Sequence, residues 1–100
     1  NKIINRLQNE FNKSPDLVIK SITINNLKKS NLETVSSSNK VNDYILKNLI
    51  LKKDNITKGN IASFIAAPNT LEIKNTDKCE FYLTNGFSLV IIDNKILAIE

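Results

Sequence analysis

The C-terminal segment "NGFSLVIIDNKILAIE" limits the possible folds more than any other part of the sequence. It contains two apolar runs, residues 87–92 and 95–99, which only Asp93 and Asn94 separate. Asp and Asn both tolerate positive φ, which a two-residue hairpin turn requires. The pattern predicts a β-hairpin with its turn at these two residues. Asp93 could instead be a ligand or metal carboxylate, but no second carboxylate is close to it in the sequence, which favours the turn.

The rest of the chain alternates between helical and extended patterns. Apolar residues at helical spacing predict helices over residues 2–12, 39–52, 60–67 and 77–84. Runs rich in β-branched residues predict strands over residues 17–24, 31–37 and 70–74. In the helix at 39–52, Val41, Ile45 and Leu49 are four apart, so we expect them on the buried side.

Polar residues and one glycine mark the expected helix ends. Ser38 or Asn39 is suited to cap the helix at 39–52, and Thr76 the helix at 77–84. Gly86 follows the latter helix and is expected to form a left-handed C-terminal cap. The alternation of elements predicts a single α/β (α+β-like) domain over residues 1–100. Its core is a small mixed β-sheet of about four to five strands with helices packed on it, ending in the C-terminal β-hairpin.

The composition narrows the classes of function. The chain has one cysteine, Cys79, and no histidine, so it cannot form an internal disulfide, a Cys-rich zinc site or a Ser–His or Cys–His nucleophile pair. Cys79 lies on the apolar side of a predicted helix, which favours a buried, inert thiol. We therefore expect no enzyme activity, no cofactor and no metal site. The longest apolar run is far shorter than the roughly 20 residues that span a bilayer, so a soluble domain is expected.

The net charge of +4 could indicate a nucleic-acid partner. However, only one of the 14 basic residues is an arginine, and the lysines are spread along the chain. Nucleic-acid sites favour clustered Arg and Lys with aromatic residues for stacking. We expect no nucleic-acid partner, and a weak surface for some other anion stays open as an alternative.

Two places are candidates for a ligand or interface site. Ser36, Ser37, Ser38 and Asn39 lie where a strand end meets a helix start, and the backbone amides there could accept an anion. No Gly-rich phosphate-loop motif accompanies these serines. Lys20 lies in a predicted strand, either as the buried partner of a carboxylate or as a solvent-facing edge residue.

In order and spacing, several segments resemble the N-terminal domain of GerA-type spore germination receptor A subunits. The family's "sDlVvR"-like segment is similar to "PDLVIKSITI", with Lys20 where the family has Arg. Its "ILkpLl"-like motif is similar to "YILKNLI", with Asn48 in place of Pro. Its closing "GxxvlfIDGxxxAl" is similar to the C-terminal segment, which supplies Gly86, Leu89, Ile91, Ile92, Asp93 and Ala98.

The sequence also departs from that family. The polar "NLETVSSSNKV" replaces an apolar strand and turn, and Asn94 replaces a Gly. The resemblance implies the first subdomain of a larger N-terminal domain, in a multi-pass subunit of the spore inner membrane. It also implies assembly, signal relay or germinant sensing during germination, with the other receptor subunits and a small-molecule germinant as partners. An enzyme or phosphate-handling domain is the alternative from another class, and a generic protein- or anion-binding module is a third.

Overall fold

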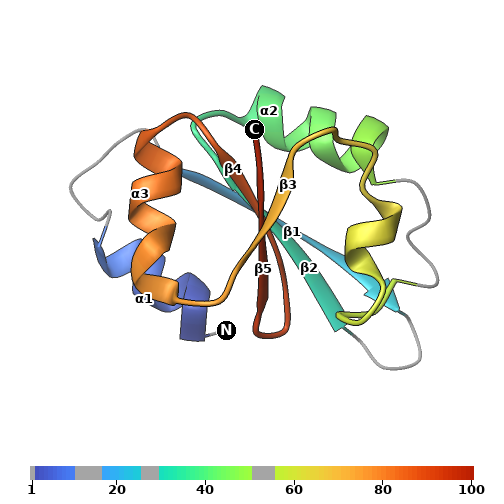
Figure 1. Cartoon of the computed structure of the whole chain (residues 1–100), viewed down its shortest axis with the longest axis horizontal. Helices are drawn as coiled ribbons and strands as arrows, with labels where there is room; N and C mark the ends of the chain where they lie inside the picture. The colour runs from blue at the N-terminus through green and yellow to red at the C-terminus, as the bar shows by residue number, and fades with distance from the viewer. Residues whose placement is uncertain (1, 11–16, 26–29, 51–55) are drawn as a thin grey trace.

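A five-stranded sheet organises the chain, with its strands in the order β1-β2-β4-β5-β3 (Figure 1). The computed structural model describes residues 2–10, 17–25, 30–50 and 56–100. Each neighbouring pair of strands runs antiparallel. The strands are β1 Val18–Asn25, β2 Ser30–Ser36, β3 Thr70–Ile73, β4 Ser88–Ile92 and β5 Lys95–Ile99.

Helices cover both faces of this sheet, so the domain has three layers (Figure 1). The helices α1 (Lys2–Glu10) and α3 (Cys79–Thr84) lie on one face, and the 3-10 turn η3 (Thr76–Lys78) leads into α3. On the other face lie α2 (Asn39–Tyr44), its continuation η1 (Ile45–Leu49), which is a π-helix, and the 3-10 helix η2 (Ile61–Phe64).

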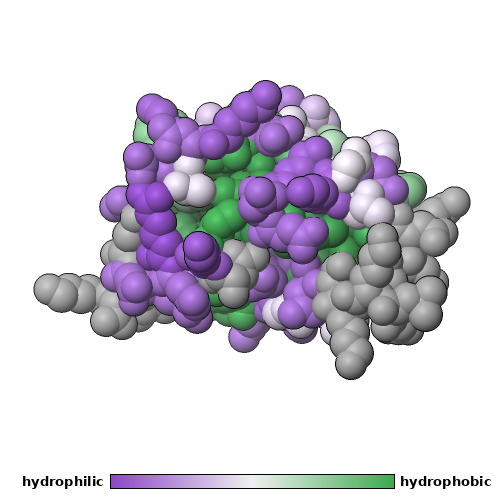
Figure 2. Space-filling model, turned by 90° about the horizontal axis from the view of Figure 1, so that it is seen from below, coloured by the Kyte–Doolittle hydropathy of each residue, from purple (hydrophilic) through white to green (hydrophobic). Residues whose placement is uncertain are grey.

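The central strands are buried on both sides. In β4, Leu89 and Ile91 belong to the hydrophobic cluster under α1 and α3, whereas Val90 and Ile92 belong to the cluster under α2 and η2. All four are at most 1% exposed. This explains why "SLVII" is apolar throughout, without the alternation of a strand that has one wet face. Figure 2 views the domain from the end of the sheet that holds the β4–β5 turn. On this side hydrophilic residues cover most of the surface, and apolar residues show between them.

The predicted α/β class, the number of strands and the C-terminal hairpin are confirmed. The expected mixed sheet is wrong in one respect, because all the pairings are antiparallel. The helix expected to reach residue 52 ends earlier, since Ile50 is extended and forms a bridge with Ile65. The predicted end of the first helix at residue 12 and residues 51–52 of the predicted helix at 39–52 lie outside the described residues.

The buried side of α2 also differs from the prediction. Val41 is 36% exposed, whereas Asn42 is fully buried together with Ile45 and Leu46. Asn42 is three and four residues before Ile45 and Leu46, which puts all three on one side of an α-helix, with Val41 at the edge of that side. Asn42 thereby takes the core-facing position that we expected of Val41.

The caps around α3 are formed by backbone and side-chain groups next to the helix. The side chain of Asn75, and not that of Thr76, caps η3 by accepting a hydrogen bond from the Asp77 amide at 3.0 Å. At the other end, the Gly86 amide donates to the Leu83 carbonyl and the Phe87 amide to the Tyr82 carbonyl. These two bonds form a Schellman motif, and the packed rings of Tyr82 and Phe87, 5.1 Å apart, complete it.

Gly86→Ala is expected to lower the free energy of unfolding by about 1 kcal/mol. Gly86 has a φ of +85°, which residues with a Cβ rarely adopt, while no heavy atom lies within 4 Å of a Cβ built there. The cost is therefore one of backbone conformation and not of a clash. Chemical denaturation measures it. Gly59→Ala is the control, because Gly59 does not have positive φ and a Cβ there makes only an ordinary contact. Equal losses in the two variants would contradict the prediction.

The β4–β5 turn matches the hairpin prediction with one correction. Ile92 pairs with Lys95, which leaves Asp93 and Asn94 as the two turn residues. We expected both to be suited to positive φ, but only Asp93 adopts it, with a φ of 53°. The short polar side chain of Asp tolerates this conformation better than most side chains do.

Candidate functional site

The strand pairing brings most of the predicted site residues together at the start of α2. In β1 and β2, Val18 lies opposite Ser36 and Lys20 lies opposite Thr34, all facing the α2 layer. The chain then turns through Ser38 into α2, which contacts both strands. We call this group the α2 site. It consists of Lys20, Ser36, Ser38, Asn42 and Asp43.

The serines of the α2 site are bonded to the backbone and to each other. The Ser36 hydroxyl donates to the Ser38 carbonyl at 2.8 Å, and the Ser38 amide donates to the Ser36 hydroxyl at 3.3 Å. The Ser38 hydroxyl accepts from the Val41 amide at 3.2 Å, which confirms Ser38 as the cap of α2. Ser37 and Asn39 are exposed beside this network. The hydroxyls thus stabilise the strand-to-helix turn, and the cap occupies one of the amides that an anion would use.

Lys20 and Asp43 form an ion pair between the edge strand β1 and α2. Both side chains are more than a third exposed, so Lys20 is a solvent-facing residue of the edge strand that has a carboxylate partner, and it is not the buried partner of a carboxylate. The hydrogen bond from Lys20 lowers the pKa of the Asp43 carboxyl below its ordinary value, and the positive charges of Lys20 and Lys47 add to this shift. Because the pKa is lower in the folded state, the stabilising effect is complete above the ordinary carboxyl pKa and is lost as the pH falls through the folded one.

Lys20→Gln is expected to raise the pKa of Asp43 toward the ordinary value, because it removes both the charged donor and the largest cause of the shift. An NMR titration of the Asp43 carboxyl carbon measures this change. Lys47→Gln is the matched control and should move the pKa less, since Lys47 acts on Asp43 only through its charge. The ion pair has no role in this shift if the two variants move the pKa equally.

Asn42 is the residue of the site that the sequence analysis missed. Its side-chain amide donates to the Val18 carbonyl at 3.0 Å and so ties α2 to the edge strand. Its Oδ1 and the Thr34 hydroxyl are buried, and neither has a hydrogen-bond partner within the described part of the chain. A signal was present in the sequence, because Asn42 is spaced three and four residues from Ile45 and Leu46, on one side of a helix.

The polar groups of the α2 site link the edge strand, the strand-to-helix turn and α2 to one another. The hydroxyls and the ammonium group that could act on a substrate are engaged with the protein itself. Across residues 2–10, 17–25, 30–50 and 56–100, no group of three or more His, Cys, Asp or Glu side chains is placed to hold a metal ion. None of the helices in those ranges is long and apolar enough to cross a membrane.

The comparison with known proteins gives a likeness of structure and none of sequence. No protein-family model and no curated protein matches this sequence. Among solved structures, the chain is similar to the N-terminal domain of the A subunit of the Bacillus megaterium spore germinant receptor GerK3. The TM-score is 0.66 at 17% identity, and the match covers 98% of this chain and 88% of that one. This chain has the fold of that germinant receptor domain.

The resemblance seen in the sequence named the same kind of domain, and the structural likeness confirms it at the level of the fold. In this chain, each of the three motif segments lies where a helix or a strand begins or ends. From Leu17 on, "LVIKSITI" leads into and forms most of β1, "YILKNLI" spans the end of α2 and η1, and "NGFSLVIIDNKILAIE" forms the Schellman cap and the hairpin. At such positions the backbone must end a helix or start a strand, which restricts its conformation more than the exact side chain. Two chains can therefore share the fold although their sequence identity is weak.

Proposed function

We propose that this chain is a non-enzymatic domain of the A subunit of a spore germinant receptor, in a multi-pass protein of the spore inner membrane. The observation that supports this most is the likeness to the GerK3 domain over 98% of the chain, together with the ordered sequence motifs. Within that role we favour contact with the other receptor subunits and relay of a signal to the membrane segments over germinant binding by this piece alone.

The distribution of polar and apolar side chains on the surface supports contact with the other receptor subunits. The α2 site uses its own polar groups internally, whereas large apolar side chains are exposed nearby and on the opposite layer. Val41 and Tyr44 lie one turn apart on α2, and Tyr44 is 57% exposed. On α3, Phe81 is 58% exposed. Exposed aromatic side chains are enriched at protein interfaces.

Co-purification tests the assembly role. The parent subunit is expressed with the other receptor subunits, either intact or without residues 1–100, and the amounts of the subunits recovered together are compared. We expect the shortened subunit to recover less of its partners. Tyr44→Ser and Phe81→Ser form a matched pair that shows which layer makes the contact. Undiminished recovery without the domain would exclude assembly.

A thermal-shift series separates sensing from assembly. The domain is heated with amino acids, sugars and nucleosides in turn, and we expect no change in its Tm. A shift produced by one class of these molecules, and lost on replacing residues of the domain, would move the proposed role from subunit contact to germinant sensing.

A further inference from the structure

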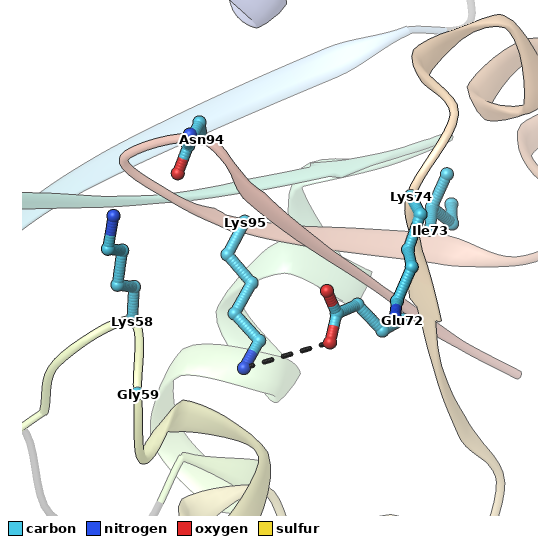
Figure 3. A pocket seen from close by; sticks show the side chains of 7 residues that line it. All are labelled: Lys58, Gly59, Glu72, Ile73, Lys74, Asn94 and Lys95. Carbon is cyan, nitrogen blue, oxygen red and sulfur yellow. Dashed lines mark ion pairs between the residues drawn. The ribbon is translucent and has the colours of Figure 1, made fainter.

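A polar hollow lies beside the edge strand β3, at the end of the sheet that holds the β4–β5 turn (Figure 3). Its volume is about 410 Å³, within the range of small-molecule sites. Three segments that are distant in the sequence form it: the loop before η2, with Lys58; β3 and the residue after it, with Glu72 and Lys74; and the hairpin, with Asn94 and Lys95. The hollow is at the far end of β2 from the α2 site, because Leu32 pairs with Ile92 beside the turn and α2 follows Ser36.

The charge of this hollow is strongly unbalanced. Its lining has three ammonium groups and one carboxylate, which gives a net charge of +2 at pH 7. Seven lining residues thus hold half of the net charge of +4 of the whole chain. The one carboxylate, Glu72, pairs with Lys95 at a long 3.8 Å between Oε1 and Nζ. Within the described residues, Lys58 and Lys74 have no carboxylate partner.

The lining offers hydrogen-bond donors to a ligand. Lysine ammonium groups have three donors and no acceptor, and the Asn94 side chain adds an amide. Figure 3 shows the Lys58 side chain reaching toward the hairpin turn, while Lys95 and Glu72 point toward each other. Positive donors around an open, polar hollow favour a ligand with anionic oxygens and disfavour an apolar one.

We propose that this hollow binds a small anion through a carboxylate or phosphate group. Lys58 and Lys74 are its main contacts. Lys95 becomes a third contact when the anion replaces Glu72 as its partner. The proposal does not depend on the receptor role, because it rests on the cavity and its charges alone. Since the site is open to solvent, binding is expected to weaken as the ionic strength rises.

An NMR titration of the 100-residue chain tests the proposal, with inorganic phosphate in one arm and succinate in the other. We expect saturable shifts of the backbone amides of Gly59, Lys74 and Asn94 at low ionic strength. Lys58→Gln and Lys74→Gln should each weaken binding by about two- to fivefold, the size expected for one exposed charge pair. The two arms show whether phosphate or carboxylate chemistry is preferred.

Two further variants distinguish a site from general surface charge. Glu72→Gln removes the opposing carboxylate and releases Lys95, so it should tighten binding by a similar factor. Lys40→Gln removes an exposed lysine at the start of α2, at the other end of the sheet, and should leave the affinity unchanged. Melting curves confirm that each variant is folded. Shifts that spread over all lysine-bearing surfaces, or equal losses in Lys40→Gln and Lys58→Gln, would overturn the proposal.

Discussion

Ile91→Ala and Ile92→Ala are each expected to lower the free energy of unfolding by about 2–5 kcal/mol. The two residues are neighbours in β4 and point to opposite faces of the sheet. In a sheet with one wet face, one of the two substitutions would be costly and the other nearly neutral. Here both side chains are at most 1% exposed, because helices cover both faces. Both substitutions therefore remove buried methylene groups and leave a cavity.

Chemical denaturation of the two variants measures the effect. Leu71→Ala is the control, because Leu71 lies in the edge strand β3 and is 45% exposed. It should cost much less than either isoleucine substitution. The three-layer arrangement is contradicted if one of the isoleucine variants is as stable as the control.

Leu7→Ala is expected to release α1 from the sheet and to lower the free energy of unfolding by about 2–5 kcal/mol. Leu7 is 1% exposed and packs with Val35, Cys79 and Leu89 in the cluster under α1 and α3. A helix of nine residues is too short to be stable alone in water, so α1 depends on this contact. The polar link from Arg6 to Thr76 and Asp77 is exposed and adds little by comparison.

Hydrogen exchange of the α1 amides, together with denaturation of the whole domain, measures the release. Gln8→Ala is the matched control, since Gln8 is the next residue of the same helix and is exposed. The prediction fails if α1 amides exchange at the same rate in Leu7→Ala as in the control. Loss of protection confined to α1 would show that the helix opens separately from the sheet.

The resemblance to germinant receptor domains rested on segments whose role is local. The sequence predicts a left-handed cap at Gly86 and a helix cap at Ser38 or Asn39, and the structure confirms Gly86 and selects Ser38, because a cap depends on residues within one helical turn of it. Thr76 was the wrong cap because two adjacent polar residues, Asn75 and Thr76, were both suitable, and only the path of the chain decides which side chain faces the free amides.

Sites built from distant segments were not visible in the sequence. Lys20 and Asp43 are 23 residues apart, and the lining of the hollow spans residues 58 to 95. Lys20 and Asp43 meet because α2 packs back on β1 and β2. The hollow depends on the strand order, in which the last hairpin inserts between β2 and β3. No local pattern specifies that order, because several arrangements of five amphipathic or buried strands bury similar apolar area.

The hairpin, the approximate positions of the helices and the class of the fold could be predicted from local patterns, because backbone preferences and apolar periodicity act over a few residues. The coverage of β4 and β5 on both faces, the inward position of Asn42 in place of Val41, and the three lysines around one hollow could not. They follow from the packing of segments that are far apart in the chain, where the side of a helix that meets the sheet, or one strand pair inserted between two others, changes which side chains meet.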